Sequence, residues 1–185
     1  MIYRTMRHHY IWFWAFLLMP VSFFFAMIKH LTVNVSGQGL HEITDRIEAM
    51  VREAGMKEGL CTLFVRHTSA SLLIQENADP AVRRDLEQWL NRLVPENFVG
   101  NKIWRASARP EGEGQDGPSQ NDPLYTHQNE GPDDMPAHLK TALTATSLSI
   151  PIEGGKLALG TWQGIYLWEH RHKRGARQIV VHLGA

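Results

Sequence analysis

The stretch that decides the fold is residues 148–183, LSIPIEGGKLALGTWQGIYLWEHRHKRGARQIVVHL. It holds short apolar runs separated by Gly-rich or basic turns, with no helix-length segment between them. Such runs, bounded by turn residues, are typical of strands. We predict four strands here, the first two joined as a hairpin through Glu153-Gly154-Gly155: 148–152, 156–159, 165–169 and 178–183.

The rest of the chain supplies helices as well as strands. Residues 30–35 alternate apolar with polar side chains, and residues 60–67 are apolar on both faces, so we predict two more strands, the second central and buried. Apolar residues recur at helical spacing over 43–54 and 80–93, and a short helix is expected over 136–143. Because the late strands follow one another with few crossover helices, we predict an α+β fold with a mixed, mainly antiparallel sheet and two to three helices.

Composition places the chain among small single-domain proteins. Its 185 residues are 43% apolar, which is enough to bury one core. Lys and Arg (19) balance Asp and Glu (19), so we expect no nucleic-acid partner, which would need a basic stripe or patch. The lone cysteine, Cys61, lies in an apolar run, which favours a core position and a reducing, cytoplasmic compartment.

The N-terminal segment differs from the rest. Basic residues precede an apolar run over 10–28, a pattern typical of a signal sequence or a membrane anchor. No small-residue cleavage pattern follows the run, and the globular pattern begins directly after Met27. We therefore favour Met27 as the true start, with residues 1–26 as a leader and residues 27–185 as a single domain. A membrane partner is expected only if the leader is retained.

Composition changes again before Tyr125. Much of residues 98–124 consists of Gly, Pro, Asp, Glu, Gln and Ser. Such a segment cannot bury enough apolar surface to order itself. We predict a flexible surface insertion here.

Polar residues follow the strand over 60–67 where the fold pattern does not require them. The segment His67-Thr68-Ser69-Ala70-Ser71 places hydroxyls and backbone amides at the end of that strand, which can cradle an anion. We take Thr68, Ser69 and Ser71 as candidate phosphate ligands, and His67 as a candidate catalytic residue that contacts metal or phosphate. The structural alternatives are a turn capped by the hydroxyls and a buried histidine bonded to a backbone carbonyl.

The densest group of histidines and acids lies in the segment YTHQNEGPDDMPAHLK, which begins at Tyr125. Imidazole nitrogens and carboxylate oxygens together can form the first shell of a divalent cation. We predict His127 and His138 as metal ligands, and Asp133 and Asp134 as catalytic acids that bind or orient the metal. The spacing matches no recognised ligand motif, and the alternative is that the two acids cap the helix while His138 faces solvent.

Further polar residues accompany the last strands. Glu169 and Arg171 are two positions apart, so they share one face of a continuing strand. A buried Glu169 needs a partner, and Arg171 is the candidate; together they are predicted as a catalytic or phosphate-binding pair. Asn77, which lies just before the helix over 80–93, and Gln163 are predicted to contact substrate.

Several of these segments together resemble the signature of the YjbQ-like proteins, a family also called secondary thiamine-phosphate synthases. The matching strings are HTSAS, ENADP, EGPDDMPAHLK, SIPIEGGKLALGTWQGIYLWEHR and RQIVVHLG, in that order. The resemblance runs from about Met27 to Gly184. The family usually moves from the second helix to the Tyr-x-His segment in a short step, so the insertion over 98–124 departs from its pattern.

The resemblance implies a compact YjbQ-like fold, self-association as a homotrimer and a site on the histidines and acids named above. It also implies a secondary thiamine-phosphate-synthase activity, in which a thiazole phosphate joins a pyrimidine diphosphate and pyrophosphate is released. Release of pyrophosphate requires charge neutralisation by a metal or by Arg and Lys. We therefore expect a divalent metal ion, zinc or magnesium, and a small phosphorylated substrate.

Two hypotheses without catalysis stay open. In the first, the same groups hold an ion that stabilises subunit contacts, so the protein is a non-catalytic metal-binding oligomer. In the second, the polar residues are caps and buried ion pairs of a structural interaction protein. Convergence of His67, His127 and His138 in space favours metal binding, and their scatter favours the structural protein.

Overall fold

The structure is a computed structural model that describes residues 26–96, 125–127 and 129–185. The predictions for residues 1–25 and for the insertion over 98–124 lie outside the described residues. The elements follow in this order: β1 (Ala26–Val35), β2 (Gly39–Glu42), α2 (Thr44–Ala54), β3 (Gly59–Val65), β4 (Ala70–Glu76), α3 (Pro80–Leu93), α5 (Asp134–Leu143), β5 (Ser147–Glu153), β6 (Lys156–Leu157), β7 (Gln163–Glu169) and β8 (Gly175–Gly184).

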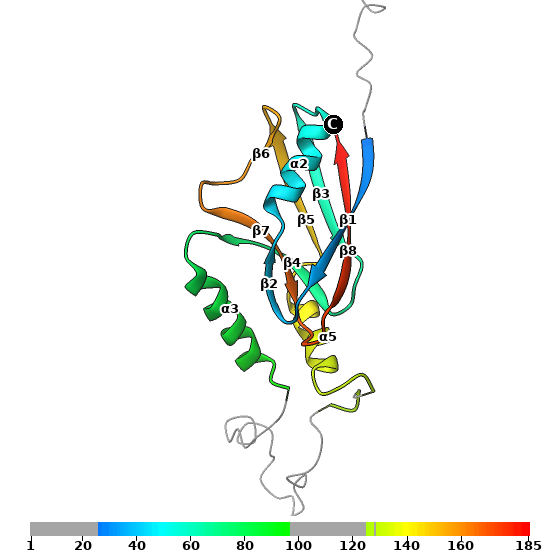
Figure 1. Ribbon diagram of the computed structural model, residues 1–185, viewed down its shortest axis with the longest axis vertical. Helices are drawn as coiled ribbons and strands as arrows, with labels where there is room; N and C mark the ends of the chain where they lie inside the picture. Colours follow the sequence, from blue (N-terminus) through cyan, green and yellow to red (C-terminus); the bar gives the residue numbers. More distant parts are fainter. Residues whose placement is uncertain (1–25, 97–124, 128) are drawn as a thin grey trace, which may run out of the picture.

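The described strands form two antiparallel sheets (Figure 1). One sheet has five strands in the order β1-β8-β3-β5-β6, and the other has three in the order β2-β7-β4. The predicted hairpin is present as β5 and β6, and β7 and β8 match the last two predicted strands. The α+β class and the antiparallel character of the sheet are therefore confirmed.

The core lies where the two sheets and α2 meet. Residues such as Leu63 of β3, Ile165 of β7 and Ile47 of α2 are fully buried in a single apolar cluster. Burial of apolar surface is the main stabilising term in such a core. Cys61 belongs to the same cluster, which confirms its predicted core position.

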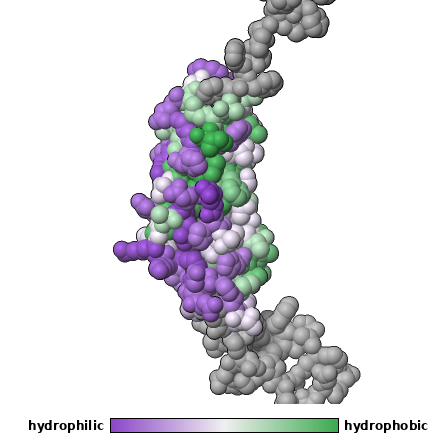
Figure 2. Space-filling model, turned by 90° about the vertical axis from the view of Figure 1, so that its right-hand side faces the viewer, coloured by the Kyte–Doolittle hydropathy of each residue, from purple (hydrophilic) through white to green (hydrophobic). Residues whose placement is uncertain are grey.

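The two faces of β3 differ more than the sequence suggests. The strand is central, between β8 and β5, and Cys61, Leu63 and Val65 point into the core. Leu60 and Phe64, on the other face, are 42% and 48% exposed, so the prediction that both faces are buried is wrong. The space-filling view of the side that carries β1 and β8 shows hydrophobic residues at the surface among hydrophilic ones (Figure 2).

Two strands of the smaller sheet were not predicted. β2 has four residues, and β4 begins within the HTSAS string and ends at Glu76. Polar residues interrupt both strands, so neither shows a clear apolar pattern. Two segments that the sequence left unassigned are therefore strands.

Helix α3 begins at the cap that the sequence predicts, whereas α5 begins at Asp134, two residues before the predicted start. Asp79 accepts a hydrogen bond from the Ala81 amide at 2.7 Å, and Pro80 occupies the first turn of α3. Within the predicted apolar stripe of α3, Leu90 is buried, whereas Trp89 and Leu93 are exposed. The stripe is therefore only partly used in packing.

The apolar N-terminal run overlaps the first strand. β1 begins at Ala26, so Met27 and Ile28 pair with Leu183 and His182 of β8. Among the helices that the structure describes, none combines the length and apolar character needed to cross a membrane.

Candidate metal site

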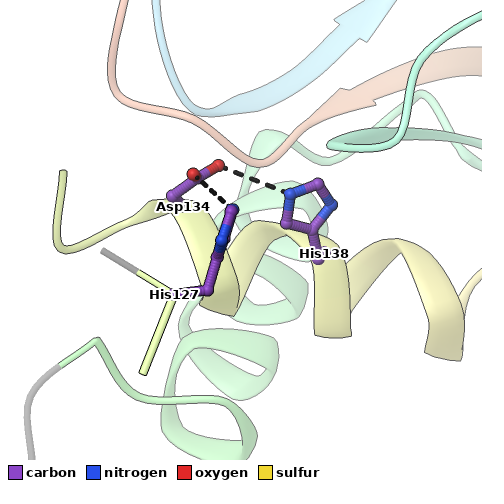
Figure 3. A group of neighbouring side chains, drawn as sticks. All are labelled: His127, Asp134 and His138. Carbon is purple, nitrogen blue, oxygen red and sulfur yellow. Dashed lines mark ion pairs between the residues drawn. The ribbon is translucent and has the colours of Figure 1, made fainter. Parts of the chain in front are cut away.

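Helix α5 and the loop before it bring together the three side chains of the candidate metal site. Asp134 and His138 are four residues apart on α5 and therefore lie on one face of the helix. His127 reaches the same point from the preceding loop (Figure 3). One ligand atom from each of the three residues lies within 4.8 Å of the other two.

The spacing of these atoms suits a small divalent cation. Nε2 of His127 lies 2.9 Å from Oδ2 of Asp134, and Nε2 of His138 lies 3.5 Å from Oδ1. Ligand atoms at about 2.0–2.1 Å from a tetrahedral zinc ion lie about 3.3 Å from one another. The two distances, each to a different oxygen of Asp134, lie on either side of that value.

Two features of hydrogen bonding leave the cluster with unused lone pairs. Among the described residues, Oδ2 of Asp134 is buried and accepts no hydrogen bond, although Nε2 of His127 lies 2.9 Å from it. Nδ1 of His138 lies 3.1 Å from the Thr68 carbonyl oxygen and donates to it, so Nε2, on the side of Asp134, is the ring nitrogen that can offer a lone pair to a cation. A hydrogen bond of this kind orients metal-binding histidines.

Arg171 neutralises the acids around the cluster. Its Nη1 donates to Oδ1 of Asp134, its Nη2 donates to the Glu130 carbonyl oxygen at 2.8 Å, and its Nε lies 3.1 Å from Oδ2 of Asp133. Burial alone lowers the pKa of Arg171, but the three acids outweigh it and the pKa lies above the ordinary value. Arg171 therefore stays charged and fixes Asp134 through Oδ1, which leaves Oδ2 for a ligand.

Asp133 stands outside the three-residue ligand group. Its Oδ2 accepts a hydrogen bond from the His172 amide at 2.8 Å and faces Arg171. Burial raises the pKa of Asp133, but the His172 amide and Arg171 more than offset this and hold the pKa below its usual range. Asp133 lies at the N-cap of α5 but makes no side-chain cap bond. Its contacts with His172 and Arg171 instead join α5 to the loop after β7.

The partner of Glu169 differs from the one predicted. Glu169 is fully buried, and its carboxylate accepts hydrogen bonds from Nε and Nη2 of Arg177, at 2.6 Å and 3.0 Å. Arg171 contributes only its backbone amide, at 2.9 Å. Because β7 ends at Glu169, strand alternation stops there, and the Arg171 side chain is free to reach the acids of α5 instead.

His67 lies beside the cluster but outside the ligand group. Its Nδ1 accepts a hydrogen bond from the Ser69 amide at 3.0 Å. Burial, and then the charge of Arg177, lower the pKa of His67, so the ring is neutral with its proton on Nε2. His67 and His138 line one shallow hollow of about 470 Å³. Two of the three predicted metal ligands thus converge with Asp134, and the third is their neighbour.

The predicted phosphate cradle separates into two environments. Thr68 is exposed and lines the same hollow as His67. Ser69 and Ser71 are buried, and Oγ of Ser71 lies 2.9 Å from Nε2 of His170. Ser71 lies on the face of β4 opposite the core residues Ala70 and Leu72 and is covered there, next to His170, so Thr68 is the hydroxyl that stays accessible.

The comparisons with known proteins agree with this architecture. A family model described as UPF0047 protein YjbQ-like matches residues 29–185. The chain belongs to this family. It is 47% identical over 153 residues to a UPF0047 protein of Synechocystis sp., covering 83% of this chain and 88% of that protein. It is 38% identical over 156 residues to the UPF0047 protein YjbQ of Escherichia coli O157:H7, covering 84% and 95%.

Solved structures show the same fold. A conserved hypothetical protein of Thermus thermophilus has a TM-score of 0.60 at 30% identity, covering 84% of this chain and 98% of that one. A YbjQ-like protein of unknown function from Sulfolobus solfataricus has a TM-score of 0.65 at 22% identity, covering 88% and 99%. None of these four relatives is named for an activity, so thiamine-phosphate synthesis stays a prediction.

Two predicted substrate contacts of this YjbQ-like chain lie far from the histidines. Gln163 pairs with Glu76 at one end of the β4–β7 ladder, next to Asn77, whereas Glu169 pairs with Ala70 at the site end. At about 3.3 Å per residue, the two ends are about 20 Å apart. Gln163 also accepts a hydrogen bond from the Gly160 amide at 2.8 Å, which shapes its own loop. Within one chain, the structure does not bring Asn77 and Gln163 to the metal site.

Thr141 is a site residue that sequence reasoning missed. It lies one turn after His138 on α5 and lines the hollow shared with His67. Threonine is so common on helices that its type alone gives no signal. Its spacing of three residues from His138 places it on the same helix face, and this was the available clue.

Proposed function

We propose that this YjbQ-like chain binds a divalent metal ion through His127, Asp134 and His138 and uses it in chemistry on a small phosphorylated molecule. The main support is the buried Oδ2 of Asp134, which has no hydrogen-bond donor among the described residues and lies beside two imidazoles. A buried carboxylate oxygen that accepts no hydrogen bond is unfavourable, and a cation between it and the imidazoles would satisfy it. Two nitrogen ligands and one oxygen favour zinc over magnesium, which prefers oxygen ligands.

The number and exposure of the ligands favour a reactive site over a closed structural one. Three protein ligands on zinc leave a position for water or substrate. The His127 side chain is 48% exposed, so that position is reachable from solvent. A bound zinc ion there supplies Lewis-acid stabilisation of negative charge on a phosphate.

The neighbouring side chains are suited to holding such a substrate. His67 presents a neutral ring whose Nε2–H can donate to a phosphate oxygen, because its Nδ1 already accepts from the Ser69 amide. Thr68 presents a hydroxyl in the same hollow. Arg171 keeps Asp134 in place through a charge-assisted hydrogen bond. The residues of the chain thus position both the ion and the anion.

Metal binding is tested by the metal content of the purified protein and by zinc titration. Asp134→Asn and His138→Ala should lower zinc affinity by at least about tenfold, since loss of even an outer-shell partner weakens metal sites by about that much. His30→Ala removes an exposed histidine from β1 and serves as the matched control. Equal zinc affinity in all of these proteins would refute the site.

The finer proposal is transfer of the thiamine-phosphate-synthase type, in which pyrophosphate leaves a pyrimidine diphosphate as the thiazole phosphate attacks. Pyrophosphate release is measured with both substrates, in the zinc-loaded protein and after chelation. We expect release that depends on zinc and that Asp134→Asn abolishes. Zinc binding without any release above the uncatalysed rate would leave a binding protein as the better description.

That alternative, a non-catalytic metal-binding oligomer, has support of its own. Ile28 and Leu60 are 56% and 42% exposed on the outer face of the five-stranded sheet, which favours self-association. The predicted homotrimer is tested by light scattering of the eluting protein with and without chelator. A change of oligomeric state on chelation, without turnover in the assay above, would favour this alternative.

A further inference from the structure

We propose that the hollow beside the metal ligands binds the phosphoryl group of a phosphate ester, recognised by Thr141, His67 and Arg66. This inference rests on the proposed metal site and adds the residues and the ligand class of its substrate side. It assigns roles to Thr141 and Arg66, which neither the sequence patterns nor the metal geometry identified.

Thr141 supplies the strongest observation. The residue is 8% exposed, and its Oγ1 has no hydrogen-bond partner among the described residues. It lines the hollow together with His67, Thr68 and His138. A buried hydroxyl without a partner is unfavourable unless a ligand or water satisfies it. Thr141 therefore points to a ligand with acceptor oxygens in this hollow.

The other donors of the hollow also favour an anion. Nδ1 of His67 is occupied by the Ser69 amide, so only its Nε2–H is available, and it can only donate. The Thr144 hydroxyl donates to the Lys140 carbonyl oxygen at 2.7 Å and is not available. The available groups are thus donors next to a proposed cation, which suits an oxyanion bridging both.

Arg66 provides a positive charge in an adjoining hollow. This second hollow, of about 400 Å³, is lined by Phe64 and Arg66 and shares His67, Thr68 and Thr146 with the first. Arg66 is exposed, and its side chain makes no ion pair with any residue that the structure describes. A guanidinium of this kind matches a phosphate in charge and geometry.

Phe64 indicates that the ligand carries an apolar organic group. Its ring is 48% exposed and forms an apolar wall next to Arg66. A ligand whose phosphoryl group lies between Thr141 and Arg66 would rest its organic group on this ring. The two hollows together thus fit a phosphate ester of a small apolar or aromatic group better than free phosphate.

The test uses the full chain loaded with zinc and two probes, methylphosphonate and phenylphosphonate, which share the anionic head group and resist hydrolysis. Binding is measured by calorimetry. Thr141→Val should weaken both probes about tenfold, the effect of one lost hydrogen bond to a charged group, and Thr141→Ser should restore them. Arg66→Gln should weaken both probes and reduce the salt dependence of binding.

Phe64 is tested by the difference between the probes. Phenylphosphonate should bind more tightly than methylphosphonate, and Phe64→Ala should abolish that preference while leaving methylphosphonate unchanged. Leu60→Ala, an exposed apolar residue of the same strand that lines neither hollow, is the control. Equal loss of preference in Leu60→Ala would refute the role of Phe64.

Zinc content is measured in every sample, which separates this inference from the metal site. If Thr141→Val and Arg66→Gln keep their zinc and bind both probes as the unchanged protein does, the phosphoryl site is refuted and the metal site stands. If the unchanged protein holds no zinc, the metal site is refuted. In that case weaker probe binding in both variants still supports the phosphoryl site, and unchanged probe binding in both variants refutes it.

Discussion

Arg177, which is mostly buried, and the fully buried Glu169 form an ion pair that links the two sheets. Nε of Arg177, in β8, lies 2.6 Å from Oε2 of Glu169, at the end of β7, and its Nη2 lies 3.0 Å from Oε1. The Arg171 amide donates to the same carboxylate at 2.9 Å. The pair therefore fixes the start of the loop whose next residues hold Asp133 and Asp134.

Breaking this pair should be strongly destabilising. Arg177→Met leaves the Glu169 carboxylate buried without a counter-charge, and we expect the free energy of unfolding to fall by about 3–5 kcal/mol. Urea unfolding followed by circular dichroism measures the change. Arg52→Met, which removes the exposed pair with Glu48 at 3.3 Å, should change it by less than about 0.5 kcal/mol. Similar losses of unfolding free energy in both variants would contradict the larger contribution expected of the Arg177–Glu169 pair.

His170 should make the fold sensitive to acid. Burial, and then the charge of Lys140, lower the pKa of His170 to about 3 from the ordinary 6.5. Between about pH 6.5 and pH 3, His170 therefore binds a proton in the unfolded chain but not in the folded chain. The stability of the fold that is present above about pH 6.5 is lost as the pH falls toward 3. At pH 5 the loss from this residue amounts to about 2 kcal/mol. Urea midpoints measured from pH 7 to pH 4 should show it.

His170→Gln tests the source of that acid sensitivity. The variant should show a smaller loss of stability between pH 7 and pH 4, whatever its stability at pH 7, because the titrating group is gone. His30→Gln, at an exposed position of β1, should keep the acid sensitivity of the unchanged protein. Identical pH profiles for the His170 variant and the unchanged protein would show that other groups are responsible.

Lys140 should tune His170 through its charge. Lys140 is buried, donates to Oδ1 of Asn91 at 2.6 Å, and has its own pKa lowered chiefly by burial. Lys140→Met should raise the pKa of His170, observed by NMR titration of its ring protons. Since burial of His170 is the larger cause, the pKa should remain below 6.5. No change in that pKa would show that Lys140 exerts no field at His170.

Cys61 should report on unfolding through its reactivity. Burial raises its pKa from 9.0 to about 11, so at pH 8 the thiolate is about 100-fold scarcer than in an unfolded chain. Labelling by a disulfide reagent should therefore be at least about 100-fold slower in the folded protein than in denaturant. Fast labelling without denaturant would mean that the β3 core opens readily.

Gly59 and Gly55 should respond differently to alanine. Gly59 has φ of +150°, and an added Cβ would press on the carbonyl oxygen of Gly184, which is backbone and cannot move aside. Gly55 has φ of +66° at the end of α2, with open space around it. Gly55→Ala should lower stability by about 1–2 kcal/mol, the value for a left-handed L-residue. Gly59→Ala should lower it by clearly more, as measured by thermal unfolding.

Much of the candidate site was readable because it is local. His138 and Asp134 lie four residues apart on a helix that Pro136 indicates, so their convergence follows from helical geometry. His127 joins them from the same segment of chain. The alignment of this local cluster with a family signature pointed to the same residues.

The misassigned residues all depend on distant contacts. The sequence suggested Arg171 as the partner of Glu169 because strand alternation relates residues two apart, but β7 ends at Glu169 and Arg177 of β8 takes that place. Ser71 was grouped with His67 because both lie in the HTSAS segment, and Gln163 was predicted separately as a substrate contact. The structure instead buries Ser71 against His170, and the register of β4 against β7 sets Gln163 at the far end of the ladder.

The sequence by itself determined the class of fold, the late antiparallel strands, the cap of α3 and the segment that holds the candidate metal ligands. These features follow from alternation, helical periodicity and turn residues, which act over a few positions. Only the tertiary structure decided which base neutralises which acid, which hydroxyls stay accessible, and that Thr141 and Arg66 line hollows that meet at His67. Those depend on strand register and on where elements end, because burial and pairing are set by contacts between segments far apart in the chain.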